Sequence, residues 1–205
     1  MRVITEQYQE EIVEKKSRFI ATIVPIETKE EAEQFIASMK KKYWDARHNC
    51  SAYVLGEKNE IMHSSDDGEP SGTAGRPMMA VLTGQDVHNV AVVVTRYFGG
   101  VLLGTGGLVR AYQGAVMKAL ESAEIKEQIP LEELKVWVSY ADMNQLDYYI
   151  SGADYIRMEG KEYEDQVICY LLVSPEKTEQ VIEDILQKTN RTAKIEKGKI
   201  RQEVL

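Results

Sequence analysis

The chain has 205 residues, of which 43% are hydrophobic and 28% charged, an ordinary composition for a globular protein. Its formal net charge of −8 excludes a generic, sequence-blind nucleic-acid coat protein, which is usually basic, so nucleic-acid binding would need a local patch. No stretch approaches the roughly 18 consecutive apolar residues of a membrane helix, and the N-terminus lacks the apolar segment of an export signal. Cys50 and Cys169 form no metal-binding spacing, so we expect a cytoplasmic protein with reduced thiols and no membrane contact.

The first part of the chain predicts helices that cover a sheet. Its helix signals include Thr28 as an N-cap and Pro77 in a first helical turn, where a missing N–H does no harm. In chain order the pattern predicts strand or hairpin over 11–26, a helix over 28–43, two strands around a turn at 56–59, a short helix over 71–84, a strand over 90–95 and a helix over 107–123. The run over 90–95 is apolar throughout, which predicts a strand covered on both faces.

The composition changes near Pro130, where glycine becomes sparse and a new alternating run begins. We therefore expect two domains, over 1–130 and 131–205. The elements of the second domain follow the order strand, helix, strand, strand, helix, strand, which is the ferredoxin-like βαββαβ pattern. The predicted fold class is α+β, with helices covering a sheet in the first domain and a ferredoxin-like second domain.

Residues 95–112, TRYFGGVLLGTGGLVRAY, place five glycines within nine positions, directly after the predicted buried strand. A strand, a glycine loop and a helix together often build phosphate and carboxylate sites, because the first helical amides have no intrahelical partner. Thr105 is the predicted N-cap. Residues 71–112 contain no lysine or glutamate, only three arginines and one aspartate, so their net charge is +2 in an acidic chain.

We call this predicted anion-binding or nucleic-acid-binding surface the Arg/Gly cradle. Its residues are Arg76, Arg96, Gly99, Gly100, Gly104, Gly106, Gly107 and Arg110. Arginine suits bidentate contact with phosphate or carboxylate. The alternative is that the glycines serve only tight turns and close helix–sheet packing.

The stretch HSSDDGEPSG, residues 63–72, provides a second candidate, a supporting or acid/base cluster of His63, Asp66, Asp67 and Glu69. A turn tip at 57–58 would pair Val54 with Ile61 and put one set of side chains on a common strand face: His48, Cys50, His63, Ser65 and Asp67. This pattern is compatible with a divalent metal site, a His–Asp acid/base pair, or a turn in which aspartates cap backbone amides. We expect no bound metal and no cofactor.

Two motifs, HSSDDGEPSGTAGRPM and VVVTRYFGGVLLGTGGLVRAY, resemble those of the IMPACT/YigZ family of cytoplasmic proteins, in its bacterial two-domain form. The resemblance implies a first domain with the βαβ fold of the fourth domain of elongation factor G and a second domain like its fifth. The family's motif positions correspond here to His63, Asp66, Asp67, Glu69, Gly72, Gly75 and Arg76, and to Arg96, Gly99, Gly100, Gly104, Gly106, Gly107 and Arg110. Eukaryotic relatives carry a further N-terminal domain, and its partner is not expected here.

The resemblance makes RNA or the ribosome the natural partner. The leading interpretation is a non-enzymatic, translation-linked module that binds RNA or a ribosome through the Arg/Gly cradle. The alternative is an enzyme acting on a phosphorylated or carboxylated small molecule, with His63 and Asp66 or Asp67 beside the cradle. A third interpretation is a protein-interaction adaptor.

The C-terminal stretch 188–202 holds six cations against one glutamate. On a final strand, Lys197, Lys199 and Arg201 would share one face. Such a face is either an edge protected from aggregation by lysines or a second stripe that contacts phosphates.

Overall fold

The computed structural model describes residues 1–204, and the chain divides into two compact units, unit 1 over Met1–Glu127 and unit 2 from Gln128 onward. The expected domain boundary at residue 130 falls inside strand β7 (Ile125–Val138), and residue 205 of the expected second domain lies outside the described residues. Within residues 1–204, two sheets and five α-helices form the expected mixed α and β fold. No helix in this range is long and apolar enough to cross a membrane.

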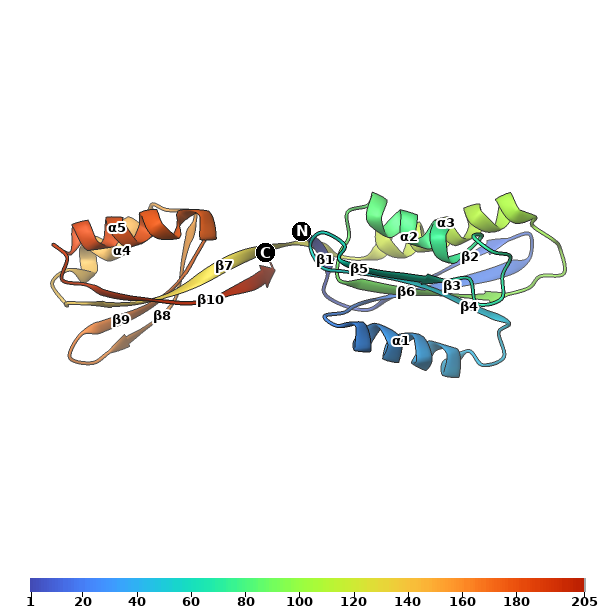
Figure 1. Ribbon diagram of the computed structural model, residues 1–205, viewed down its shortest axis with the longest axis horizontal. Helices are drawn as coiled ribbons and strands as arrows, with labels where there is room; N and C mark the ends of the chain where they lie inside the picture. The colour runs from blue at the N-terminus through green and yellow to red at the C-terminus, as the bar shows by residue number, and fades with distance from the viewer. Residues whose placement is uncertain (205) are drawn as a thin grey trace. The chain divides into compact units, whose positions relative to one another are not determined.

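Unit 1 contains eight main elements, which are β2 (Tyr8–Glu14), β3 (Ser17–Pro25), α1 (Lys29–Lys42), β4 (His48–Leu55), β5 (Ile61–Ser65), α2 (Gly75–Gly84), β6 (Val90–Tyr97) and α3 (Thr105–Ser122). The strands form an antiparallel sheet in the order β2-β3-β6-β4-β5. Helix α1 covers one face, and α2 and α3 cover the other (Figure 1). A short strand, β1 (Arg2–Ile4), pairs with the first residues of β7.

Two predictions for unit 1 are confirmed in detail. Strand β6 lies at the centre of the sheet and is buried from Val90 to Arg96, as its apolar, mostly β-branched run predicts for a strand covered on both faces. Helix α1 follows Thr28, whose Oγ1 accepts a hydrogen bond from the backbone N–H of Glu31 at 3.2 Å. The apolar stripe and the N-cap both predict a helix over the same residues, so local and tertiary preferences coincide in α1.

The predicted register of the hairpin formed by β4 and β5 is wrong by one residue. Val54 pairs with Met62, not Ile61, and Tyr53 pairs with His63. The connection is a five-residue loop over 56–60, with positive φ angles at Gly56 and Asn59, and not the shorter turn expected. Because strand side chains alternate, this slip moves His63 to the face opposite His48 and Cys50, so the expected common face does not form.

Unit 2 contains the rest of β7, α4 (Met143–Ser151), β8 (Ile156–Tyr163), β9 (Val167–Val173), a 3₁₀ turn η1 (Pro175–Lys177), α5 (Thr178–Lys188) and β10 (Lys194–Val204). Its strands lie in the order β10-β7-β9-β8, and every pairing is antiparallel. Both helices pack on one face of this sheet (Figure 1). The core between the helices and the sheet contains Leu134, Val136, Leu171 and Ile185.

The expected cationic face of the last strand does not form. The register of β10 shifts between Lys197 and Ile200, so Lys197 pairs with Leu134 and Arg201 pairs with Leu131. Residues 131 and 134 of β7 point to opposite faces, which puts Lys197 and Arg201 on opposite faces as well. A bulge of this kind changes the phase of alternation, and Gly198, which lies within it, is the sequence signal that the prediction did not use.

Candidate functional site

Four connections of unit 1 meet at one end of its sheet (Figure 1). The strand register requires this, because Arg18 on β3 and His48 on β4 pair with Tyr97 and Arg96, the last residues of β6. Helix α3 begins at the same end, after the connection from β6. We call this the loop end, and it consists of residues 15–16, 43–47, 66–74 and 98–104 with the adjoining ends of their helices and strands.

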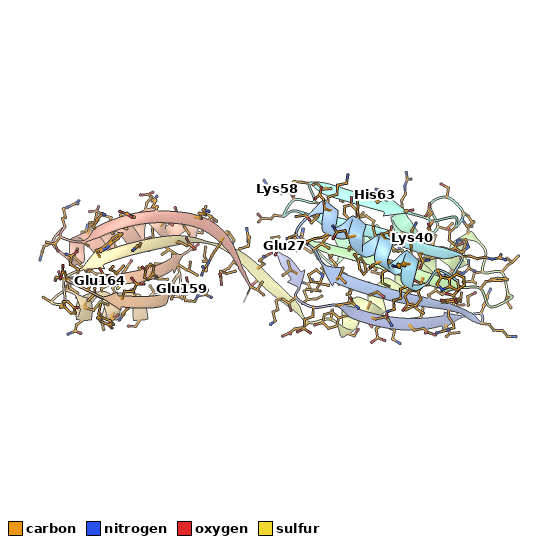
Figure 2. The ribbon with its side chains drawn as sticks, turned by 90° about the horizontal axis from the view of Figure 1, so that it is seen from below. Glu27, Lys40, Lys58, His63, Glu159 and Glu164 are labelled. Atoms are coloured by element: carbon orange, nitrogen blue, oxygen red, sulfur yellow. The ribbon has the colours of Figure 1, made fainter. Side chains whose placement is uncertain are left out.

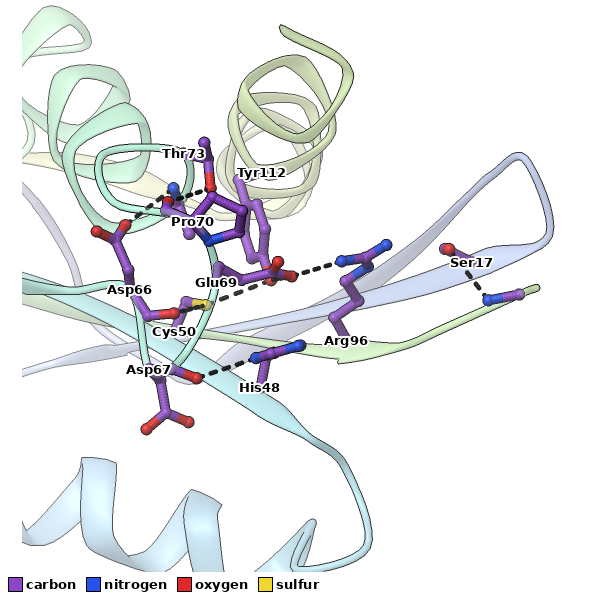
Figure 3. Close-up of polar contacts among 12 residues, drawn as sticks. Ser17, His48, Cys50, Asp66, Asp67, Glu69, Pro70, Thr73, Arg96 and Tyr112 are labelled. Atoms are coloured by element: carbon purple, nitrogen blue, oxygen red, sulfur yellow. Dashed lines mark hydrogen bonds and ion pairs between the residues drawn. The ribbon is translucent and has the colours of Figure 1, made fainter. Parts of the chain in front are cut away.

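A buried ion pair lies just inside the loop end (Figure 3). Arg96 Nη1 donates to Glu69 Oε1 at 2.7 Å, with only 7% and 3% of the two side chains exposed. The Arg96 guanidinium also contacts the rings of Phe19 and Phe98, at 5.5 and 5.6 Å from their centroids. An unpaired charge at this depth would be strongly destabilising, so the pair fixes the 66–74 connection against the end of β6.

The same glutamate connects the ion pair to α3 and β4. Tyr112 Oη donates to Glu69 Oε1 at 2.8 Å, and the Cys50 thiol lies 3.3 Å from Tyr112 Oη. Burial raises the pKa of the Cys50 thiol to about 12 and raises the pKa of the Tyr112 hydroxyl further above its ordinary value. Both groups are therefore neutral at physiological pH, and Cys50 is not an activated nucleophile.

Asp66 caps the N-terminus of α2. Its carboxylate accepts hydrogen bonds from the backbone N–H groups of Gly72, Ala74 and Gly75 at 2.7, 3.0 and 2.8 Å. Partial burial opposes ionisation of this carboxyl group, but the three hydrogen bonds outweigh it and hold the pKa of Asp66 below its ordinary value. Of the interpretations left open for this cluster, the observed geometry of Asp66 fits the backbone cap.

Asp67 attaches the same connection to β4 and α1. Its Oδ2 accepts from the backbone N–H of Asn49 at 2.7 Å, and its Oδ1 accepts from Lys40 Nζ at 2.6 Å. Its backbone oxygen lies 3.0 Å from His48 Nδ1. If Nδ1 carries the proton and donates to this carbonyl oxygen, the lone pair of His48 is on Nε2.

The loop end brings together only some of the predicted residues. Arg96, Glu69 and the two aspartates lie in one network, whereas His63 is exposed on edge strand β5 and stacks on Tyr53 at 5.4 Å. Within residues 1–204, no group of three His, Cys, Asp or Glu side chains could hold a metal ion. The sequence analysis placed His48 on the predicted common face through the wrong β4–β5 register, and it did not pair His48 with Arg96, its cross-strand neighbour. A correct alignment of β4 on β6 would have identified this pair.

The glycines of the Arg/Gly cradle serve different purposes. A Cβ at Gly99 would lie 2.0 Å from the carbonyl carbon of Lys16, so no other residue fits there without moving the β2–β3 turn. A Cβ at Gly107 would lie 2.9 Å from Leu103 Cβ. Gly106 differs, because the nearest atom to its Cβ would be Arg110 Nη1 at 3.6 Å, an ordinary contact with a flexible side chain. Gly106 therefore leaves the surface bare at the start of α3, although packing there would allow a larger side chain.

The N-terminus of α3 lies at this bare surface. The helix begins at Thr105, so the prediction that Thr105 is its N-cap is wrong, and Gly104 occupies the cap position with φ 72° and no side-chain hydrogen bond. Thr105 and Gly106 are exposed. Amides of the first turn have no intrahelical acceptor, and the helix dipole adds positive potential. Beside them, Lys15 and Arg110 line a cavity of about 240 Å³.

Seven exposed cations at the loop end form no ion pair with any other residue of 1–204, and they are Lys15, Lys16, Lys41, Lys42, Arg47, Arg76 and Arg110. The acids there that lack an ion pair within the same range are Glu14, Asp45 and Asp66, the last of which accepts only backbone N–H groups. Lys40, by contrast, is neutralised by Asp67. This end is therefore strongly positive although the whole chain carries −8.

Known proteins resemble the chain over most of its length. Residues 15–120 match the model of the Impact N-terminal domain. The chain is 36% identical over 197 residues to the IMPACT family member YvyE of Bacillus subtilis (strain 168), which covers 96% of this chain and 90% of that protein. It is 42% identical over 142 residues to the IMPACT family member YigZ of Escherichia coli (strain K12), which covers 68% of this chain and 70% of that protein.

A solved structure described as that of a hypothetical protein superposes with a TM-score of 0.63 at 31% sequence identity and covers 95% of each chain. Protein IMPACT of Danio rerio is 34% identical over 103 residues, but the match covers only 48% of this chain and 32% of that protein. The similarity is thus widest among the bacterial proteins, and the chain belongs to the IMPACT/YigZ family.

Proposed function

We propose that the protein is a translation-linked module that binds RNA or a ribonucleoprotein through the loop end of unit 1. The observation that carries the proposal is the set of seven exposed cations without ion-pair partners, beside the uncapped N-terminus of α3. Cations already paired on a protein surface gain little from a phosphate, whereas free ones release the counterions of the nucleic acid. Backbone amides at the start of α3 add donors for a phosphate oxygen.

The predicted site residues have different roles in this proposal. Arg76 and Arg110 contact phosphates from the surface, and Gly106 leaves room for a phosphate at the helix. Arg96 contributes through the ion pair with Glu69 that shapes the end of the sheet, and only its donors not bound to Glu69 are left for an anion. His63, on the far edge strand, has no role.

The folds that we propose for the two units support a link to translation. We propose that unit 1 is similar to the fourth domain of elongation factor G and that unit 2 has a ferredoxin-like fold. The second proposal draws support from the element order β-α-β-β-α-β and the strand order β10-β7-β9-β8. A shared fold alone does not give a shared function, so the free cations remain the main support for RNA binding.

The test measures the affinity of the full chain for a labelled single-stranded RNA of about 16 nucleotides by fluorescence anisotropy. The double variant Lys15→Gln/Arg110→Gln should weaken binding at least about ten-fold, since each charge-assisted contact contributes roughly 1.5–3 kcal/mol. A matched control is Arg2→Gln/Lys58→Gln, which removes an exposed arginine and an exposed lysine without ion pairs within residues 1–204 at the opposite end of unit 1, where Figure 2 labels Lys58. RNA affinity that is absent, or equally reduced by both double variants, would refute the proposal.

The position of His48 favours a second candidate function, in which the protein is an enzyme that acts on a phosphorylated or carboxylated small molecule at the loop end. His48 Nδ1 lies 3.0 Å from the carbonyl oxygen of Asp67, and the cross-strand neighbour of His48 is the buried Arg96. A histidine held in this way can act as a general base through Nε2. A screen of anionic metabolites for stabilisation of the parent, but not of His48→Gln, would support this function over RNA binding.

A further inference from the structure

Large apolar side chains are exposed among the free cations of the loop end. Trp44 and Leu102 are each 82% exposed, and Phe98 is 52% exposed. Trp44 belongs to the α1–β4 connection, and the other two belong to the β6–α3 connection. A fold gains nothing from holding a tryptophan and a phenylalanine in water, so such residues indicate a surface that contacts another molecule.

Each of the two aromatic residues is next in sequence to one partner of a single hydrogen bond. Tyr97 Oη donates to Asp45 Oδ1 at 2.8 Å, and Trp44 and Phe98 are the chain neighbours of these two residues. The bond ties the α1–β4 connection to the end of β6, so both rings belong to the same part of the loop end. It also limits how far the two connections can move apart.

The Phe98 ring packs against the side chain of Arg96. The Arg96 guanidinium lies 5.6 Å from its centroid, and that arginine is fixed in turn by its ion pair with Glu69. A cation against an aromatic ring stabilises the position of the ring. The buried network thus supports an aromatic side chain whose remaining surface is open to solvent.

The charges around these rings select the class of partner. Lys41 and Lys42 precede Trp44 and Arg47 follows it, and none of the three has an ion-pair partner within residues 1–204. A partner that is apolar and uncharged would leave these cations unmatched. Exposed aromatic rings among free lysines and arginines are the features by which proteins bind single-stranded nucleic acid, with bases on the rings and phosphates on the cations.

We propose that Trp44 and Phe98 are stacking platforms for unpaired bases of a single-stranded RNA. The inference rests on the proposed function and deepens it, because it assigns the recognition of bases to two residues outside the Arg/Gly cradle. The cradle and the free cations bind the phosphates, while the two rings require bases that are not paired. A duplex of the same sequence, whose bases are stacked on each other, binds more weakly.

The chain offers a direct optical test, because it contains only two tryptophans, Trp44 and Trp137. In the Trp137→Phe variant, all tryptophan emission comes from Trp44. A single-stranded RNA should quench this emission as it binds, since a stacked base contacts the indole ring. An oligomer of the same length built of abasic residues carries the same phosphates and should bind at least about ten-fold more weakly without quenching.

The supporting variants are Trp44→Ala and Phe98→Ala, each expected to weaken RNA binding roughly ten-fold. Trp44→Phe keeps an aromatic ring and should restore most of the affinity. The matched control is Tyr148→Ala, which removes an aromatic side chain that is 83% exposed in unit 2. This control should leave RNA affinity unchanged.

The outcomes separate the inference from the proposed function. If the RNA and the abasic oligomer bind equally well and neither alanine variant matters, base stacking is wrong while phosphate binding stands. If neither oligomer binds at all, the proposed function fails and the inference fails with it. If the alanine variants leave RNA affinity intact but abolish association of the chain with itself, the exposed rings form a protein contact and the inference is overturned.

Discussion

At the scale of single residues, the loop end depends on contacts between segments far apart in the sequence. Glu69 and Arg96 are separated by 27 positions, and Glu69 and Tyr112 by 43. The composition of 71–112 drew attention to three arginines in a region without lysine or glutamate, but it could not assign a partner to each arginine. Arg76 and Arg110 are exposed, as the hypothesis of an anion-binding surface requires, whereas Arg96 compensates a buried carboxylate.

This difference leads to a prediction for stability. Arg96→Met should lower the free energy of unfolding by about 3–5 kcal/mol, because it leaves the Glu69 carboxylate buried without its cation. The double variant Glu69→Gln/Arg96→Met should recover part of this loss, since it removes both charges. Urea unfolding at neutral pH, followed by circular dichroism, measures the parent, both single variants and the double variant. Losses that simply add, or a single loss below about 1 kcal/mol, would contradict a coupled buried pair.

At the scale of helices and strands, what the sequence could predict depends on how local the signal is. Helix α1 has its cap, its acidic first turn and its basic last turn within one segment, and it was predicted closely. The register of β4 on β5 depends on loop geometry, and a single extra loop residue moved His63 to the other face. The bulge in β10 separated Lys197 from Arg201 in the same way. Alternation predicts faces only while the register is unbroken.

The β6–α3 connection yields a prediction that separates packing from binding. Gly99→Ala should cost more than about 2 kcal/mol of stability, because its Cβ would overlap the backbone of Lys16. Gly106→Val should change stability by less than about 1 kcal/mol, since valine is no worse than glycine in a helix and its Cβ meets only Arg110.

The same Gly106→Val variant should weaken RNA binding, because its branched side chain covers the first amides of α3. Thermal unfolding and RNA titration of the same preparations distinguish the two effects. Should Gly106→Val bind RNA as the parent does, the start of α3 would not contact phosphate. Should it instead unfold as readily as Gly99→Ala, the glycine would serve packing alone.

At the scale of the whole molecule, an acidic chain gathers seven exposed cations without ion pairs at one end of unit 1. The stretch 188–202 seemed to offer a second positive surface, but four of its six cations are in ion pairs within unit 2. Lys197 pairs with Glu179, and Arg201 pairs with Glu133, Glu159 and Glu203. Ion pairs of this kind offer a phosphate little, because each contact has to displace a carboxylate. The net charge of the chain, or of one segment, therefore does not locate the proposed RNA contact.

The salt dependence of RNA binding should consequently belong to unit 1. For a single strand, the slope of log affinity against log salt changes by about 0.7 for each phosphate that the protein no longer neutralises. The Lys15→Gln/Arg110→Gln variant should flatten this slope by about 1.4, the sum for two phosphates. The triple variant Lys197→Gln/Lys199→Gln/Arg201→Gln removes three positive charges but should leave the slope unchanged, while it lowers the stability of unit 2 by breaking ion pairs. Titrations between about 50 and 200 mM salt measure both slopes. A flattened slope in the triple variant would place phosphate contacts on β10 and would contradict an RNA interface confined to the loop end.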